Sequence, residues 1–271
     1  MSDYLSSLFS LEGKTALIAG GAGAIGSAIS EAFAKAGARV IVHDLSAERL
    51  GLIEKRFETE KLAFHGLQAD LSSEAACAEL VRRALDVTGR IDILVNLQGA
   101  NRRKPITDVS QEDFDAITSV NFRSVYFLSK AVQPVMKAQG GGKILHFSSL
   151  SANISFDTIS VYAATKAAVT SLTKSMAHEW AGDNIQVNAI EPGFVQTEFT
   201  RPLWDDEYRS QWFADYIPAG HLAVPEDLIT TSLSLVAPAS RYITGRNVVV
   251  DGGVLSGDSW VQKEGKASVY P

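Results

Sequence analysis

A tyrosine and a lysine four positions apart are the residues of this sequence best suited to move a proton. Residues 162–166 read Tyr-Ala-Ala-Thr-Lys, within an alanine-rich run. On a helix, Tyr162 and Lys166 would lie on one face, one turn from each other. The pKa of a tyrosine is about 10, and a positive charge within roughly 4–6 Å lowers it by about 1–3 units. The pair predicts a group for general acid–base catalysis, although this spacing also occurs on helices without any such role.

A glycine-rich turn near the N-terminus predicts a phosphate-binding site. Residues 19–26 read Ala-Gly-Gly-Ala-Gly-Ala-Ile-Gly, between the apolar run Lys14–Ala19 and the amphipathic run Ala24–Lys35. Glycines permit close approach of the backbone, and the N-terminus of the following helix presents free N–H groups to a phosphate. A purely structural turn would use the same glycines, but a strand before it and a helix after it are what a dinucleotide site requires. The cofactor residues predicted here are Gly20, Ala24, Ile25 and Gly26.

A carboxylate after the second predicted strand favours NAD over NADP. Asp44 follows the strand-like run Arg39–His43, about 20 residues after the glycine turn. A carboxylate at this place accepts hydrogen bonds from both hydroxyls of the adenosine ribose and repels a 2′-phosphate. The segment Val40–Leu45 contains no arginine or lysine to attract that phosphate. The alternative is that Asp44 caps the next helix, for which Ser46 is also suited.

Apolar strand-like runs alternate with helical runs along the whole chain. This order predicts βαβ units and a parallel sheet covered on both faces. Because no composition break marks a second domain, we expect residues 1–271 to form one α/β domain with a doubly wound, seven-stranded sheet of the Rossmann type. The predicted strands are Lys14–Ala19, Arg39–His43, Leu62–Leu67, Ile91–Asn96, Lys143–Ser148, Ile185–Ile190 and Arg246–Asp251, and the predicted helices are Ala24–Lys35, 46–60, Ser73–Val87, Gln111–Lys137, Tyr162–Ala181 and one that begins at Glu226.

The composition argues against several classes of protein. The net charge is −6, from 25 basic and 31 acidic residues, and without a basic run neither nucleic acid nor an anionic membrane surface is expected as a partner. The single cysteine, Cys77, excludes an intrachain disulfide and fits a reducing compartment. No apolar run approaches 18 residues and no basic start precedes an apolar core, so we expect neither a membrane span nor a secretion signal. These features predict a cytoplasmic protein, and we expect no metal ion.

Seven short motifs occur in the order and at the separations of one enzyme family. The chain resembles the short-chain dehydrogenase/reductases over residues 11–253, with the glycine turn similar to that family's TGxxxGxG. Ala19 stands for the threonine and Ala24 for the middle glycine, and Leu97-Gln98 replaces Asn-Ala in the family's NNAG. The departures are expected to weaken or reposition cofactor binding. The other matching motifs are Asp70-Leu71, Asn96 with Gly99, Val120-Asn121-Phe122, the catalytic set of Ser149 with Tyr162 and Lys166, Pro192-Gly193-Phe194-Val195-Gln196-Thr197 and Asp251-Gly252-Gly253.

The resemblance implies a role for each motif. It makes Tyr162 the base that takes the hydroxyl proton while hydride passes to the nicotinamide, and Ser149 the hydrogen-bond partner of the substrate oxygen. It implies that Lys166 lowers the pKa of Tyr162 and holds the nicotinamide ribose, and that Asn121 orders a water in a proton path. It also implies a homotetramer formed through the helix of Tyr162. The further cofactor contacts that it implies are Leu45, Asp70, Leu71, Asn96, Gly99, Pro192, Gly193, Val195 and Thr197.

Three cations in the loop after Gly99 suggest an anionic substrate. Arg102-Arg103-Lys104 could be a solvated charge cluster, which is the preferred interpretation for Lys104. One arginine here would reach the mouth of the site and bind an oxyanion bidentately. An Arg at the place of Arg103 resembles the sugar-acid branch of the family, such as gluconate 5-dehydrogenase and 2-keto-3-deoxygluconate 5-dehydrogenase. Asn153 and Arg201 are two further predicted substrate contacts.

The long segment after the last matching loop predicts a lid. Residues 194–218 follow the nicotinamide-binding turn, where such segments usually exclude water. Trp204, Tyr208 and Trp212 are spaced by four, which would also suit one helix face packed on the core. The polar tail, residues 254–271, is either disordered or packed on a neighbouring subunit.

Together these features predict an NAD-dependent dehydrogenase acting on a secondary alcohol of a sugar acid or polyol, with a ketone or lactone as product. The alternative is a 3-oxoacyl thioester reductase, although Asp44 argues against the NADPH that such enzymes use. A relative that has lost turnover is a third hypothesis. The complete set of Asn121, Ser149, Tyr162 and Lys166 argues against it.

Overall fold

The protein folds around one parallel sheet. In the computed structural model, which describes residues 3–198, 200–201 and 204–257, seven strands are ordered β3-β2-β1-β4-β5-β6-β7, and every neighbouring pair is parallel. The predicted doubly wound α/β sheet of the Rossmann type is therefore confirmed. The strands are β1 (Thr15–Ala19), β2 (Arg39–Asp44), β3 (Phe64–Gln68), β4 (Ile93–Asn96), β5 (Gly142–Phe147), β6 (Ile185–Pro192) and β7 (Asn247–Val250).

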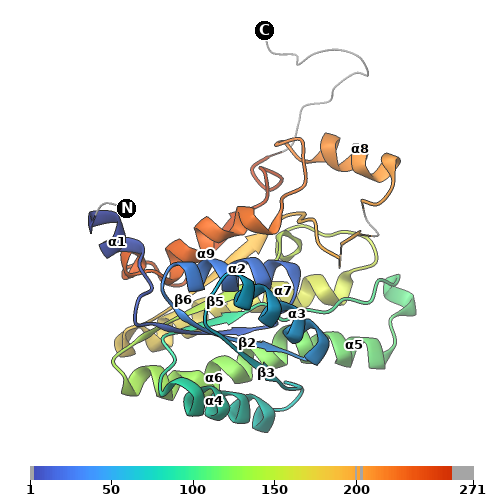
Figure 1. The fold of residues 1–271 in the computed structure, drawn as a ribbon. Helices are drawn as coiled ribbons and strands as arrows, with labels where there is room; N and C mark the ends of the chain where they lie inside the picture. Colours follow the sequence, from blue (N-terminus) through green and yellow to red (C-terminus); the bar gives the residue numbers. More distant parts are fainter. Residues whose placement is uncertain (1–2, 199, 202–203, 258–271) are drawn as a thin grey trace.

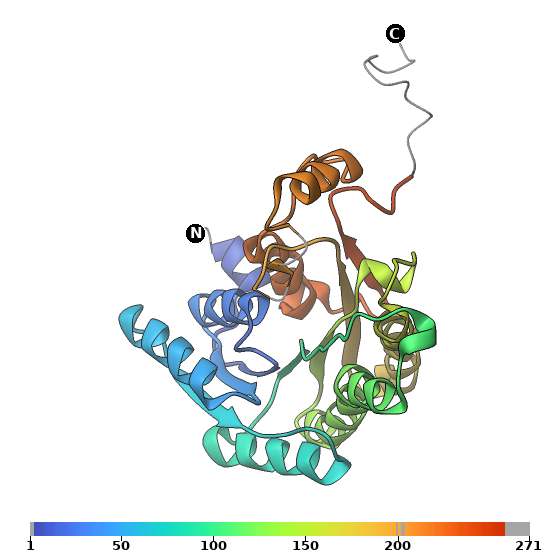
Figure 2. The same ribbon diagram turned by 90° about the vertical axis from the view of Figure 1, so that its right-hand side faces the viewer.

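Helices cover both faces of the sheet (Figures 1 and 2). Successive side chains of a strand point to opposite faces, so Leu17 packs into one core and Ile18 into the other. One core holds α2, α3 and α9, and the other holds α4, α6 and α7. No helix of the described ranges is long and apolar enough to cross a membrane. The helices are α1 (Asp3–Phe9), α2 (Ala24–Lys35), α3 (Ala47–Thr59), α4 (Glu74–Thr88), α5 (Gln111–Thr118), α6 (Ser124–Ala138), α7 (Ser160–Trp180), α8 (Glu207–Tyr216) and α9 (Ile229–Val236).

The predicted helical region Gln111–Lys137 is confirmed, but it is not one regular α-helix. A π-helical turn, Ser119–Arg123, separates α5 from α6. Within it the Asn121 side chain is fully buried and hydrogen-bonds the backbone of Ala100, in the loop after β4. The wider turn lets this side chain reach that loop, and such π-bulges often occur at functional sites.

Two helices lie where the sequence predicted none. α1 precedes the first strand, and α8 lies in the predicted lid. The Asp206 side chain caps α8 by accepting a hydrogen bond of 2.8 Å from the Arg209 N–H. The predicted tail lies mostly outside the described residues, which end at Gly257.

The chain reverses its direction of travel across the sheet between β1 and β4. From β1 it builds outward to β2 and β3, and then returns to place β4 on the other side of β1. Crossovers on opposite sides leave a crevice at the carboxyl ends of these two strands. Gly20 closes the turn after β1 with a φ of +73°, and a Cβ there would lie 2.7 Å from the backbone nitrogen of Gln98. Only glycine permits both this conformation and this contact.

Candidate active site

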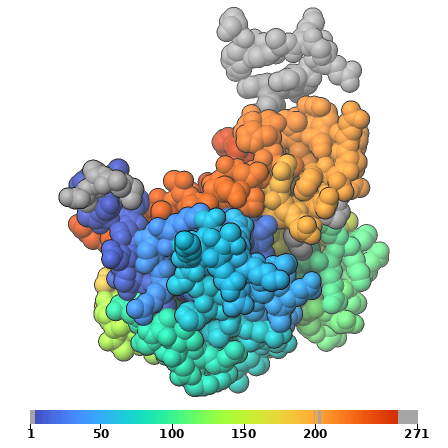
Figure 3. All heavy atoms as spheres, viewed as in Figure 1, coloured from blue at the N-terminus to red at the C-terminus, as the bar shows by residue number. Residues whose placement is uncertain are grey.

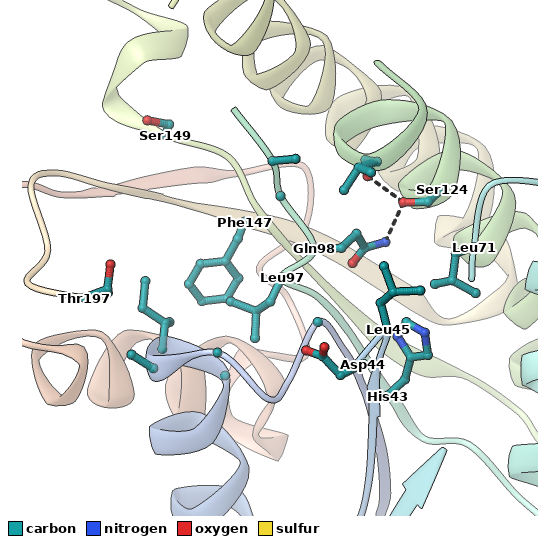
Figure 4. A pocket seen from close by; sticks show the side chains of 18 of the residues that line it. His43, Asp44, Leu45, Leu71, Leu97, Gln98, Ser124, Phe147, Ser149 and Thr197 are labelled. Carbon is teal, nitrogen blue, oxygen red and sulfur yellow. Dashed lines mark hydrogen bonds between the residues drawn. The ribbon is translucent and has the colours of Figure 1, made fainter. Parts of the chain in front are cut away.

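A cavity of about 520 Å³ lies over the carboxyl ends of the central strands (Figure 4). Asp44 and Leu71 lie at one end of it, and Ser149 and Thr197 lie at the other. The structure therefore places the predicted cofactor residues and the predicted catalytic Ser149 around one cavity. The predicted cofactor residues that line it are Gly20, Ala24, Ile25, Gly26, Asp44, Leu45, Asp70, Leu71, Gly99, Tyr162, Lys166, Pro192, Gly193, Val195 and Thr197.

The glycine turn has the geometry of a phosphate cradle. Gly23 is the N-cap residue of α2 and supplies no side chain to the N–H groups of the first turn. Ala24 and Ile25, in that turn, line the cavity. At Gly26 a Cβ would lie 2.5 Å from the Cα of Gly21, so the helix packs directly on the turn. The backbone N–H groups and the helix dipole can hold the phosphates of a dinucleotide.

Asp44 offers one carboxylate oxygen to the cavity. Its side chain is only 4% exposed. Oδ1 accepts hydrogen bonds from the Ser46 N–H and from Arg49 Nη2, both at 2.9 Å, while Oδ2 has no hydrogen-bond partner within the described ranges. Arg49, from α3, also lines the cavity. The sequence prediction missed this cation because it considered only the residues of the strand end.

Burial works against proton loss from Tyr162. Burial raises the pKa of this phenol, and a hydrogen bond with Ser149 and the charge of Arg103 partly oppose the rise. The Ser149 oxygen already accepts hydrogen bonds from the N–H and the hydroxyl of Ser151, so its own hydrogen is available to Tyr162. A phenol and a hydroxyl thus converge on one point at the end of the cavity.

Lys166 does not lower the phenol pKa as predicted. Its side chain is 4% exposed, and burial lowers its own pKa to about 8, so it stays mostly protonated at pH 7 and loses its charge as the pH rises through 8. Nζ donates a hydrogen bond of 2.7 Å to the Phe147 carbonyl and lies 5.6 Å from the centroid of the Tyr162 ring. The sequence prediction of a lowered pKa for Tyr162 was wrong because it counted the charge of Lys166 and not the burial of both groups.

Asn121 and Asn96 lie behind the cavity wall. The Asn121 Oδ1 accepts from the Ala100 N–H at 2.7 Å, and its Nδ2 donates to the Ala100 carbonyl and to Thr165 Oγ1. Asn96 is 1% exposed and donates from Nδ2 to Ser129 Oγ. Neither is among the described residues that line the cavity. Both hold other residues in place, so a direct cofactor contact for Asn96 is not what this geometry supports.

The carboxylate of Asp113 pairs with two of the three adjacent cations. Asp113 accepts from Arg102 at 3.0 Å and from Lys104 at 2.5 Å, and these bonds hold its pKa well below the usual range. Arg103 has no acidic partner within the described ranges. Although the residue is exposed, partial burial lowers the pKa of Arg103, and the charge on Tyr162 opposes that effect. Arg103 is therefore the cation of this loop that faces the reactive end.

Two predicted substrate contacts lie away from the cavity. Arg201 pairs with Asp205 at 3.7 Å on the surface. Asn153 is exposed and donates from Nδ2 to Glu191 at 2.7 Å. Like Arg103, both are absent from the described cavity lining. Glu191, which is 3% exposed, lies within strand β6 and was not among the predicted site residues.

Aromatic rings connect α8 to both sides of the reactive end. Phe194, which follows the turn after β6, contacts Phe156 from the loop after Ser149 at 5.4 Å between ring centroids. Phe213 of α8 contacts Phe194 at 4.8 Å, and Trp212 stacks on Tyr216 at 4.6 Å. Phe213, not the expected Trp212, is the buried ring of this helix. The orange α8 segment stands above the body of the molecule in Figure 3, in the place predicted for a lid.

Comparisons with known proteins agree with this geometry. A family model described as enoyl-(acyl carrier protein) reductase matches residues 20–255. The chain is 37% identical over 253 residues to the 2-dehydro-3-deoxy-D-gluconate 5-dehydrogenase of Bacillus subtilis, covering 93% of this chain and 99% of that one. It is 36% identical over 247 residues to a tropinone reductase homolog of Arabidopsis thaliana, covering 91% and 95%. A solved gluconate 5-dehydrogenase of Burkholderia cenocepacia, in complex with NADP and tartrate, has a TM-score of 0.89 and 34% identity, covering 94% and 100%.

The fold, the cavity and these matches define an oxidoreductase with a nicotinamide cofactor, and the chain belongs to the short-chain dehydrogenase/reductase family. Within that family, its similarity to gluconate 5-dehydrogenase and 2-dehydro-3-deoxy-D-gluconate 5-dehydrogenase matches the predicted sugar-acid branch.

Burial of Lys166 makes stability depend on pH. Its pKa falls from the usual 10.5 to about 8, so between these values the unfolded chain binds a proton that the folded chain has lost. The free energy of unfolding then rises with pH, by at most about 1.4 kcal/mol per pH unit. We expect wild type to gain stability relative to Lys166→Met as the pH rises from 8 to 10.5, measured by urea unfolding. A constant difference over this range would contradict the lowered pKa.

Proposed function

We propose that the protein is an NAD-dependent dehydrogenase that interconverts a secondary alcohol and a ketone or lactone on a sugar acid or related polyol. The observation that carries this proposal is that Ser149, Tyr162 and Lys166 line the same cavity as Asp44, with Ser149 and Asp44 at its two ends. A proton-transfer group and a ribose-binding carboxylate therefore share a single space.

The chain's residues divide the work of the reaction. When bound, NAD supplies the hydride acceptor. Tyr162 takes the hydroxyl proton as the carbinol C–H bond breaks and the C–O double bond forms, and Ser149 donates a hydrogen bond to the substrate oxygen. Lys166 binds the nicotinamide ribose, and the turn around Asn121 orders a water that passes the proton to solvent. Because burial raises the pKa of Tyr162, alcohol oxidation speeds up as the pH rises.

Replacement of Tyr162 tests the proton-transfer role. We expect Tyr162→Phe to lower kcat at least about 100-fold, since positioned acid–base groups contribute roughly 10²–10⁴-fold. Binding of NADH, followed by its fluorescence, should remain within a factor of about 3 because the ring stays in place. Substantial remaining turnover would sink the assignment of Tyr162 as the base.

Arg103 supports an anionic substrate. Its guanidinium acts on Tyr162 and lacks an acidic partner within the described residues, so it is available to a carboxylate entering at the reactive end. The two neighbouring cations, by contrast, both pair with Asp113, and Arg102 pairs with Glu112 as well. The relative solved with tartrate carries a dicarboxylate hydroxy acid. We propose that Arg103 binds the carboxylate of the sugar acid, with Asn153 and Arg201 as outer contacts that require movement of their loops.

Two arginine variants separate a substrate contact from a general charge effect. We expect Arg103→Ala to raise KM for an aldonate roughly 10-fold or more, because a hydrogen bond to a charged group contributes about 1.5–3 kcal/mol, and to leave KM for a neutral polyol nearly unchanged. Arg102→Ala also removes one positive charge, but from a side chain that is paired with Asp113. It should therefore change KM by less than about 3-fold. Equal effects in both variants would contradict a substrate contact and would mean that Arg103 is only part of a solvated charge cluster.

Asp44 supports NAD as the preferred cofactor, while related structures contain NADP. The nearly buried carboxylate has one oxygen left for ribose hydroxyls and would repel a 2′-phosphate. Arg49 neutralises part of that charge from the exposed side of Asp44. We therefore propose that NAD is preferred and that the preference depends on Asp44 more than on any other side chain.

The cofactor preference can be tested with two carboxylate variants. We expect Asp44→Ala to lower the ratio of kcat/KM for NAD to that for NADP by about 10-fold or more, since it removes a charge-assisted contact and a repulsion. Glu48→Ala removes an exposed carboxylate from the first turn of α3, the helix that follows Asp44, and should leave the ratio within about 2-fold. A wild-type protein that already prefers NADP would contradict the proposal.

A 3-oxoacyl thioester reductase is the second candidate. The matching family model is described as an enoyl-(acyl carrier protein) reductase, which acts at a different bond but also on an acyl thioester. Such a substrate would require NADPH in place of the cofactor that Asp44 favours. Turnover of an acetoacetyl thioester with NADPH, in the absence of turnover of aldonates, uronates and polyols with NAD, would establish it over the leading proposal.

We further propose a cytoplasmic homotetramer that packs through α7. Ala164 is exposed on this helix, and Ala163, Ala167 and Ala168 are half-buried, so a second copy of the helix could approach closely. Light scattering should give four times the chain mass, and a monomer would refute the assembly.

A further inference from the structure

Gln98 brings a buried, unpaired acceptor to the cavity wall. The residue follows β4, lines the cavity and is 8% exposed. Its Nε2 donates to Asn96 Oδ1 at 3.2 Å and to Ser124 Oγ at 3.0 Å. Its Oε1 is buried and has no hydrogen-bond partner within the described part of the chain. A buried amide oxygen without a donor is costly, so a ligand that supplies a donor is stabilised there.

A chain of hydrogen bonds fixes the orientation of this amide from one side. On α7, Thr173 Oγ1 donates to the Val169 carbonyl and must therefore accept from His146 Nδ1, at 3.0 Å. His146 is fully buried and neutral, because burial lowers its pKa to about 3. Its Nε2 then accepts from Ser129 Oγ, at 3.2 Å.

The chain of hydrogen bonds continues from Ser129 through Asn96 to Gln98. Because Ser129 gives its hydrogen to His146, its Oγ accepts from Asn96 Nδ2, at 3.1 Å. The Asn96 oxygen is then turned towards Gln98 and needs a donor.

Ser124 fixes the amide from the other side. Its hydroxyl donates to the Val120 carbonyl at 2.6 Å, so its oxygen is also an acceptor for Gln98. With an acceptor on each side, Nε2 must occupy the present position, and a flipped amide would leave two acceptors facing one oxygen. Figure 4 shows both contacts of Ser124, with the Gln98 oxygen on the side of the amide that faces the cavity.

The unpaired oxygen lies at the adenosine end. The Cys77 thiol contacts the backbone oxygens of both Leu71 and Ser124, at 3.8 and 3.9 Å, so the partner of Gln98 adjoins the wall that contains Leu71. Asp44 faces the same end. The reactive residues, Ser149 and Tyr162, lie at the opposite end.

We propose that Gln98 Oε1 accepts a hydrogen bond from the 6-amino group of the cofactor's adenine, which makes Gln98 a determinant of base specificity. This inference rests on the proposed function, because it requires an adenine dinucleotide in the cavity. The ring nitrogens of adenine are acceptors, and the ribose hydroxyls are matched by Asp44. The amino group is the adenosine donor left for an acceptor at this wall. Asp70, which also lines this end, is a second acceptor, and the amino group has two hydrogens to donate.

The experiment compares two dinucleotides that differ at this one group. In nicotinamide hypoxanthine dinucleotide an oxygen replaces the 6-amino group, so the donor becomes an acceptor. Isothermal titration with each dinucleotide gives a ratio of dissociation constants, hypoxanthine over adenine form, without any turnover. We expect Gln98→Met, which is apolar and of similar length, to lower this ratio roughly 3- to 10-fold relative to wild type, as the loss of one buried hydrogen bond implies.

Controls separate base recognition from a structural effect. Leu97→Met exchanges one apolar side chain for another next to Gln98 in the cavity lining. It should leave the ratio of the two dissociation constants unchanged. If Gln98→Met does not fold, Gln98→Ala, the residue of the family motif, replaces it and should show the same fall. Equal weakening of both dinucleotides, with an unchanged ratio, would overturn the inference and leave Gln98 a structural residue. A wild-type protein that binds neither dinucleotide would overturn the proposed function as well.

Discussion

The contact between Gly20 and the backbone of Gln98 is the constraint on which the cavity depends. It joins the turn after β1 to the end of β4, the two strands at which the chain reverses its travel across the sheet. Any side chain at Gly20 would need to occupy space that the Gln98 backbone already fills, and would be strained at a φ of +73°. A wider separation would move the glycine turn away from the loop that contains Gly99 and Ala100, and the adenosine and reactive ends would no longer share one space.

Electrostatics at the reactive end follow from burial more than from attraction. Lys166 and Tyr162 are each shifted toward their neutral forms, and His146, behind them, is kept neutral in the same way. In such an environment a single outside charge has a large effect, because little solvent screens it. Arg103 is the charged side chain that acts on the phenol here, so a substrate carboxylate that binds Arg103 would also alter the proton affinity of Tyr162.

The fold was predictable because central strands such as β1 and β4 are buried on both faces and therefore read as continuous apolar runs. The cavity residues were predictable because glycines and short motifs mark the carboxyl ends of strands. Contacts made across the sequence were not. Arg49 pairs with Asp44, and Asp113 pairs with Arg102 and Lys104 but not with Arg103. These pairings depend on the directions of the side chains, which cannot be read from residue spacing. The pKa of Tyr162 was predicted with the wrong sign, since a sequence gives neighbouring charges but not the loss of water around them.

The rings of Phe156, Phe194 and Phe213 have a consequence for how this scaffold diversifies. Stacked and tilted rings are held by contact area and a weak directional term, whereas Lys166 on α7 is fixed by a hydrogen bond from its Nζ to the Phe147 carbonyl at the end of β5. A change of ring size beside Ser149 therefore reshapes the entrance without disturbing Tyr162 or Lys166. Chemistry and substrate choice are therefore mechanically separable in this molecule, and the proteins similar to it include both a gluconate 5-dehydrogenase and a tropinone reductase homolog.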